Sequence, residues 1–116
     1  MKRTETVKRD NLLVEYLLEH KGIENAVSRH DIAEYLTANG YEQKAVTVHG
    51  IIERFIKERN LPICSINGKG YFWAKTKADI LASIDELQSR ITSMQEHIEH
   101  LKKLYYGVRN EKYNLL

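Results

Sequence analysis

The chain has 116 residues, of which 29% are charged and 42% are hydrophobic, which is the balance of a globular protein and not of a disordered one. This length suits one domain with one long accessory helix. The net charge of +2 excludes both a strongly basic nucleic-acid coat and a polyanion. The single cysteine, Cys64, excludes an intrachain disulfide framework. Because neither a signal peptide nor an apolar run of about 18 residues is present, we expect a cytoplasmic protein.

The small net charge conceals an uneven distribution along the chain. Residues 1–60 carry ten basic and ten acidic residues, whereas residues 61–79 have a net charge of +2 and residues 80–106 a net charge of −1. The first nine residues have a local charge of +3, since they contain one acidic residue, Glu5, and four basic ones, Lys2, Arg3, Lys8 and Arg9. Binding of an anion must therefore depend on where individual cations lie.

Three amphipathic helices are predicted in the first 60 residues, because apolar residues recur there at a spacing of three or four. The predicted ranges are about 6–21, 28–40 and 44–59. Helix-stopping residues lie at or just after the end of each range: Gly22, then Asn39-Gly40, then Asn60 with Pro62. Ser28 and Asp31 open the second helix in a capping pattern. The predicted apolar faces are Leu12, Leu13, Tyr16, Leu17 and Leu18; Ile32, Ala33, Tyr35 and Leu36; and Val48, Ile51, Ile52, Phe55 and Ile56.

The period of the pattern changes after the third helix. Segments 62–66 and 71–74 are short and rich in β-branched or aromatic residues, and Asn67-Gly-Lys-Gly70 lies between them. Since Gly and Asn tolerate positive φ, this pattern predicts a β-hairpin. Its turn consists either of Asn67-Gly68 alone or of all four residues.

A long helix is predicted from Thr76 to Tyr106, with a second capping pattern at Thr76 and Asp79 and with Gly107 at its end. Its apolar residues alternate in steps of four and three, as an unbroken heptad seam. The seam consists of Ile80, Ile84, Leu87, Ile91, Met94, Ile98, Leu101 and Tyr105. Ile at a with Leu or Met at d favours two strands if the pairing is parallel, but the e and g positions do not select an orientation. We expect a homodimer through this helix; the alternative is that the helix packs back on its own domain.

Three helices followed by a hairpin are the element order of a winged helix, a helix-turn-helix variant of α+β class in which the third helix enters the major groove of DNA. The exposed side of the helix at 44–59 would then have to carry groups that donate to base edges or phosphates. The candidate DNA-binding residues on or next to this helix are Gln43, Lys44, Thr47, His49 and Arg54. Glu53 and Glu58 oppose phosphate binding, and Gly50 indicates either close approach of the backbone to a ligand or crowding between helices.

Further candidates for DNA contacts lie outside the third helix. Ser28, Arg29 and His30 open the second helix, whose N-terminus favours an anion. Lys69 lies at the tip of the hairpin, where it either contacts a phosphate or is only a solvated turn residue. The cations of the first nine residues either form a flexible arm directed toward a groove or keep the terminus solvated.

Three segments carry a family resemblance: Ile32-Ala-Glu-Tyr-Leu36, the helix Val48 to Ile56, and Gly68-Lys-Gly-Tyr71. Together they resemble the N-terminal winged-helix domain of the biotin operon repressor type, over about residues 10–75. They are also similar to small winged-helix proteins encoded by phages and prophages of Gram-positive bacteria, in which a Gly-Tyr-Phe strand also precedes a long helix. The resemblance implies DNA binding in the regulation of transcription or replication. The connection 39–44 is longer than in the repressor and no effector domain follows, so no small-molecule effector is implied.

Motifs of enzymes are not found in the sequence: it has no Gly-rich phosphate loop, no nucleophile elbow and no Cys-x-x-Cys. Cys64 is interpreted as a packed strand residue. His97 and His100 lie beside acidic residues, and this group is interpreted as a solvated helix face and not as a metal site. We therefore expect no catalysis, no metal and no cofactor.

The sequence thus predicts a winged-helix DNA-binding domain at 1–75, a dimerisation helix at 76–107 and a tail at 108–116. The expected partners are duplex DNA and a second copy of the chain, and not a membrane. The alternative function is a protein–protein adaptor, in which the winged helix is a scaffold and the coiled coil recruits a partner. The zero net charge of residues 1–60 favours this alternative.

Overall fold

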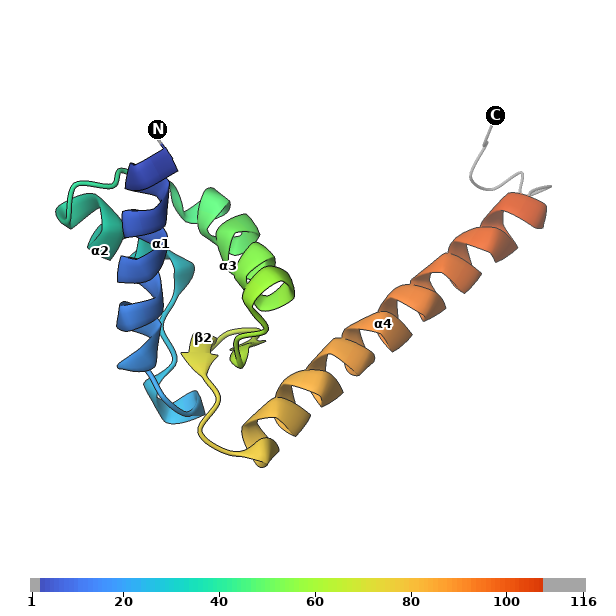
Figure 1. Cartoon of the computed structure of the whole chain (residues 1–116). Coiled ribbons are helices and arrows are strands. Elements are labelled where there is room, and N and C mark those ends of the chain that lie inside the picture. The colour runs from blue at the N-terminus through green and yellow to red at the C-terminus, as the bar shows by residue number, and fades with distance from the viewer. Residues whose placement is uncertain (1–2, 108–116) are drawn as a thin grey trace. The chain divides into compact units, whose positions relative to one another are not determined.

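In the computed structural model, which describes residues 3–107, the chain is an α+β protein with four α-helices and one antiparallel hairpin (Figure 1). The elements are α1 (Arg3–Leu18), a 3₁₀ turn (Ile23–Asn25), α2 (Arg29–Ala38), α3 (Ala45–Arg59), β1 (Ile63–Ile66), β2 (Gly70–Trp73) and α4 (Lys77–Tyr106). The predicted tail at 108–116 lies outside the described residues. The chain divides into two compact units, one through Ser83 and one from Ile84 onward.

The boundaries of α2 and α3 follow the predicted signals closely. The Ser28 hydroxyl caps α2 by accepting a hydrogen bond from the Asp31 N–H at 3.1 Å. Lys44 is the N-cap residue of α3, and Asn60 ends that helix in the left-handed conformation, with φ 56°. Local sequence therefore suffices to start and stop these two helices.

Helix α1 begins and ends earlier than predicted, at Arg3–Leu18. The residues after it form backbone hydrogen bonds with β2, since Gly22 N donates to Trp73 O at 2.9 Å and Trp73 N donates to His20 O at 2.8 Å. These long-range bonds replace the last turn that the local pattern favours.

The hydrophobic core lies between α1, α2, α3 and the hairpin. It consists of Leu13, Leu17, Val27, Ile32, Ala33, Leu36, Val48, Ile52, Phe55, Ile63 and Tyr71. Four residues of the predicted apolar faces are only partly buried against this core: Leu12, Tyr16, Tyr35 and Ile51. Two more are exposed, Leu18 at 39% and Ile56 at 38%. Both lie at the edge of the apolar face of their helix, and only the residues in the middle of that face are buried.

The hairpin has a three-residue turn, so neither predicted turn is correct. Ile66 pairs with Gly70, which leaves residues 67–69 as the turn, and Lys69 N donates to Ile66 O at 2.9 Å. Gly68 has φ 82°, a conformation that glycine adopts without strain.

The hairpin is also joined to the segment before α2. Val27 N donates to Tyr71 O and Tyr71 N donates to Val27 O, both at 2.8 Å, in an antiparallel bridge. Gly70 has φ 108°, and a Cβ at this position would collide with the Val27 carbonyl oxygen. A glycine is therefore required where the hairpin meets the start of α2.

Helix α4 opens with the predicted cap. The Asp79 carboxylate accepts hydrogen bonds from Lys75 N at 2.8 Å and from Thr76 N at 3.3 Å. One turn later Ser83 is buried, and its hydroxyl donates to Ser65 O of β1 at 3.1 Å. The first turns of α4 thus belong to the N-terminal unit, which extends beyond the predicted range 1–75.

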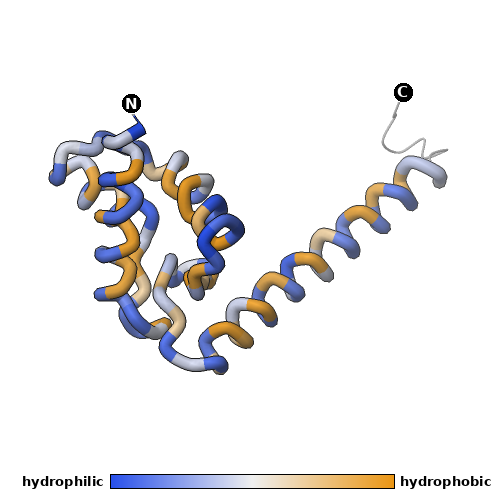
Figure 2. Tube along the Cα trace, viewed as in Figure 1, coloured by the Kyte–Doolittle hydropathy of each residue, from blue (hydrophilic) through white to orange (hydrophobic). Residues whose placement is uncertain are grey.

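Apolar and polar residues alternate along α4 (Figure 2), and every residue of the heptad seam is exposed. Its eight residues have exposed fractions between 41% for Ile80 and 76% for Tyr105. Within residues 3–107, none of the helices combines the length and the apolarity that crossing a membrane requires.

Candidate nucleic-acid interface

Helix α3 has one buried face and one open polar face. Val48, Ile52 and Phe55 are fully buried in the core. The exposed residues at its start and on its other side include Lys44, Thr47, His49, Gly50, Glu53 and Lys57. Most of the predicted contact residues of this helix therefore lie on a surface that a ligand can reach.

Gly50 lies in the middle of this open face. A Cβ built on it would have no neighbouring atom within 4 Å, so the interpretation that neighbouring helices crowd this position is wrong. Glycine inside a helix costs about 1 kcal/mol relative to alanine. What remains is the interpretation that the backbone of α3 is left bare for close approach of a ligand.

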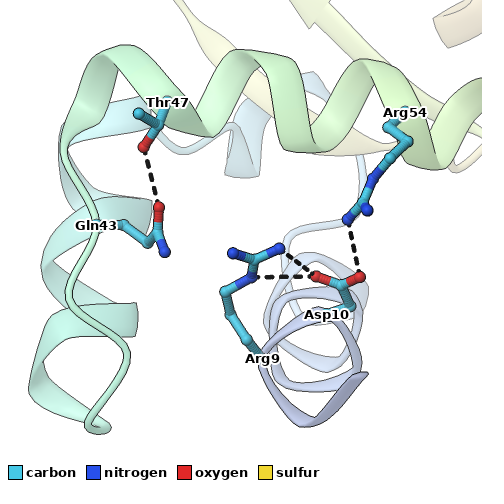
Figure 3. A network of polar contacts seen from close by, with 5 residues as sticks. All are labelled: Arg9, Asp10, Gln43, Thr47 and Arg54. Atoms are coloured by element: carbon cyan, nitrogen blue, oxygen red, sulfur yellow. Dashed lines mark hydrogen bonds and ion pairs between the residues drawn. The ribbon is translucent and has the colours of Figure 1, made fainter. Parts of the chain in front are cut away.

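The start of α3 is tied to the end of α2 through Gln43 and Thr47 (Figure 3). The single proton of the Thr47 hydroxyl is shared between Gln43 Oε1 at 3.0 Å and Lys44 O at 2.8 Å, and Gln43 N donates to Thr37 Oγ1 at 3.2 Å. Gln43 is therefore half-buried and not exposed as predicted. Because its carbonyl oxygen accepts from Thr47, its amide NH₂ is the group left to donate to a ligand.

Gln43 and His30, two predicted contact residues, line the same open depression between α2 and α3. Glu34 and Thr37 of α2 complete its polar lining. The fold thus brings together residues that are 13 positions apart in sequence. A carboxylate inside this depression weakens its attraction for phosphate.

Arg54 is partly exposed, with 40% of its side chain accessible, and it is also paired with another helix, which the sequence did not indicate. Its Nη2 donates to Asp10 Oδ2 of α1 at 2.9 Å (Figure 3). Asp10 is only 5% exposed, and its Oδ1 also accepts from Arg9 Nε at 3.1 Å and Nη2 at 2.9 Å. One buried carboxylate is therefore shared by two guanidinium groups, which offsets only part of the charge of Arg54.

The predicted flexible basic arm is also wrong for the residues that the structure describes. Arg3, Lys8 and Arg9 are part of α1, and Arg9 is bound to Asp10. The helix extends back to Arg3, since residues 3–6 contain neither Gly nor Pro to interrupt it. Lys2 lies outside the described residues.

The N-terminus of α2 and the hairpin turn each present further cations. Arg29 and His30 are exposed in the first turn of α2, whereas the Ser28 hydroxyl is occupied as the cap. Lys69 is exposed in the turn between β1 and β2. These two places and the face of α3 supply the candidate anion contacts of the N-terminal unit.

His49 connects the face of α3 to β2. Its Nδ1 and the Tyr71 hydroxyl are hydrogen-bonded at 2.7 Å, and its Nε2 lies 3.8 Å from Glu53 Oε1. Burial raises the pKa of Tyr71 above its ordinary value; the Arg29 charge acts against this rise and the Glu53 charge adds to it. Tyr71 was not among the predicted site residues, because an aromatic residue in a predicted strand is usually interpreted as part of the core.

Val46, on the open face of α3, is a second residue that the sequence interpretation missed. It is 71% exposed in the first turn of α3, next to Thr47. Its position off the buried row formed by Val48 and Ile52 was the available signal. An exposed aliphatic group among donors is suited to contact with the methyl group of thymine.

No protein-family model, curated protein or solved structure matches this chain. Among residues 3–107, no group of three or more His, Cys, Asp or Glu side chains is arranged to hold a metal ion.

Proposed function

We propose that this chain is a winged-helix protein that binds duplex DNA as a homodimer, with α3 in the major groove and the hairpin turn against the phosphate backbone. The observation that carries this proposal is the open face of α3, which is bare at Gly50 and bears donor groups at Lys44, Thr47 and His49. The major groove of B-DNA is wide enough for an α-helix with such groups.

The order of the elements supports the winged-helix part of the proposal. The segment before α2 pairs with β2 through Val27 and Tyr71, so the hairpin is attached to the helical core beside α2 and α3. The turn that holds Lys69 would be the tip of the wing. In a winged helix this tip contacts DNA next to the recognition helix.

The number of cations limits the expected affinity of one subunit. Arg29, Lys44 and Lys69 are exposed and form no salt bridge within residues 3–107, whereas Arg54 is paired with Asp10. A few phosphate contacts give weak and salt-sensitive binding. A dimer would double them and place two α3 helices on two half-sites, as operator-binding regulators do.

The exposed seam of α4 supports self-association. Large apolar side chains from Ile80 to Tyr105 are 41% to 76% exposed, and burying such a side chain completely contributes about 1.5–3 kcal/mol. Ile at the a positions with Leu and Met at d is the composition of two-stranded coiled coils. Regulation of transcription or replication in a bacterium or a phage is the role that this combination suits.

Fluorescence anisotropy with random duplex DNA at several salt concentrations tests the proposal on the full chain. We expect binding that weakens steeply as salt rises, and a loss of about tenfold or more when Arg29, Lys44 and Lys69 are changed together to Ala. A matched control changes Lys8, Lys102 and Lys103 to Ala, which removes the same charge from α1 and α4. No binding at low salt, or an equal loss in both variants, would contradict the proposal.

The rival function is a protein–protein adaptor that uses the N-terminal unit as a scaffold. Two observations favour it: Arg54 is engaged by Asp10, and Glu53 lies on the open face of α3. A folded dimer that fails to bind DNA at every salt concentration is the result expected from an adaptor.

A further inference from the structure

The hydrogen bond between Tyr71 and His49 places a buried hydroxyl under an exposed imidazole. Tyr71 is 8% exposed, and its hydroxyl lies 2.7 Å from His49 Nδ1. The His49 side chain is 55% exposed on the open face of α3. One nitrogen of the ring therefore faces the protein, and the ring as a whole is accessible to a ligand.

The chemistry of the two neighbours decides which nitrogen of the neutral ring carries the proton. The Tyr71 hydroxyl can donate its one proton to His49 Nδ1 or accept a proton from it, so the charge near Nε2 selects between these two arrangements. On the other side of the ring the Glu53 carboxylate, 3.8 Å from Nε2, is too distant for a hydrogen bond. Its negative charge still favours a proton on that nitrogen.

We infer that Tyr71 is a positioning residue that holds His49 in the tautomer with the proton on Nε2, so that His49 meets DNA as a hydrogen-bond donor. This inference rests on the proposed DNA binding. The matching group on DNA is an acceptor: a purine N7, guanine O6 or thymine O4 on a base edge, or a phosphate oxygen. The amino groups of adenine and cytosine do not match, so His49 would discriminate between bases if it faces a base edge.

The tautomer itself is tested without DNA, by long-range ¹H–¹⁵N correlation NMR of the full chain at alkaline pH, where imidazoles are neutral. We expect His49 as the Nε2–H tautomer, with an unprotonated Nδ1 that accepts a hydrogen bond. In Tyr71→Phe the ¹⁵N chemical shift of His49 Nδ1 should move to the value of an unprotonated imidazole nitrogen that accepts no hydrogen bond. A proton on Nδ1 of His49 in the unaltered chain would overturn the inference.

The role in recognition is tested by DNA affinity. Tyr71→Phe keeps the buried ring and removes only the hydroxyl, and we expect about a fivefold loss of affinity, the size of one net hydrogen bond. Tyr16→Phe is the matched control, because Tyr16 stacks on Tyr35 between α1 and α2. Circular dichroism should show the same fold for both variants. Unchanged affinity in Tyr71→Phe, or an equal loss in the control, would overturn the role of Tyr71.

Selection from a randomised pool of duplexes distinguishes the two kinds of acceptor. If the acceptor is on a base, the unaltered chain should enrich one class of base at a position where His49→Ala shows no preference. If the acceptor is a phosphate oxygen, both proteins should select the same sequences and His49→Ala should bind all of them about fivefold more weakly. Equal affinity and equal selection would overturn the donor role of His49.

Absence of any DNA binding by the unaltered chain would refute the proposed function and the role in recognition, whereas the NMR experiment would still decide the tautomer.

Discussion

The Asp10 carboxylate of α1 and the Arg54 guanidinium of α3 are joined at 2.9 Å, so one ion pair connects the first helix to the helix proposed to enter DNA (Figure 3). Asp10 also holds Arg9, whose side chain is 11% exposed. One carboxylate thus lies between two cations, of which Arg9 is nearly buried and Arg54 is 40% exposed. Because hydrogen-bonded ion pairs are directional and apolar contacts are not, the Asp10–Arg54 pair favours one position of α3 on α1.

Replacing Asp10 by Asn should destabilise the fold. The substitution keeps the size of the side chain but leaves the buried charge of Arg9 and the half-exposed charge of Arg54 without a counter-charge. We expect the free energy of unfolding to fall by about 2 kcal/mol, less than for a fully buried pair because Arg54 is partly solvated. Urea denaturation measures this change. Asp85→Asn, at an exposed position of α4, is the control, and an equal change in both variants would refute the role of Asp10.

Replacing Gly50 by Ala should separate stability from binding. Because the added Cβ meets open space, we expect the helix to gain up to about 1 kcal/mol of stability in urea denaturation. If the bare backbone serves close approach to DNA, the same variant should bind duplexes more weakly in anisotropy. Gain of stability with unchanged DNA affinity would show that Gly50 has no part in binding.

A charge in the seam of α4 should abolish self-association. Ile91 is 62% exposed at a central a position, and an aspartate there would face its counterpart across the seam. We expect light scattering to report a dimer for the unaltered chain and a monomer for Ile91→Asp. Ser89→Asp introduces the same charge on the outer face and should remain a dimer. A monomeric unaltered chain would rule out dimerisation by α4.

Cys64 should react slowly with thiol reagents in the folded chain. It is 6% exposed, and its pKa is raised by burial, with a smaller contribution from the Asp79 charge and an opposing hydrogen bond from Ser83. Since the thiolate is the reactive form, unfolding in urea should accelerate modification by at least about tenfold. A native rate equal to the unfolded rate would contradict the burial.

The raised pKa of Cys64 also makes the free energy of unfolding depend on pH. Folding holds the proton on the Cys64 thiol more tightly than the unfolded chain does, so the stabilisation is complete below the ordinary thiol pKa of 9.0 and is lost as the pH rises through the folded value. Unfolding curves measured above about pH 8.5 should therefore show a decline that is smaller in Cys64→Ala.

Local patterns in the sequence determined most of the elements. Capping residues at Ser28 and Asp79, the stop at Asn60 and the spacing of Val48, Ile52 and Phe55 predicted α2, α3 and α4 within a few residues. The reason is that helix caps, stop signals and apolar periodicity act over one or two turns of chain, so that they are visible without knowledge of the fold.

Tertiary structure alone decided what the face of α3 offers to a ligand. Arg54 is turned toward Asp10, 44 residues away in sequence, and His49 is held by Tyr71, 22 residues away. Likewise the pairing of Val27 with Tyr71 sets where the hairpin attaches. Each of these contacts depends on which distant groups the packed core brings within 3 Å, and periodicity along one helix carries no information about the charge or hydroxyl that another element will place there.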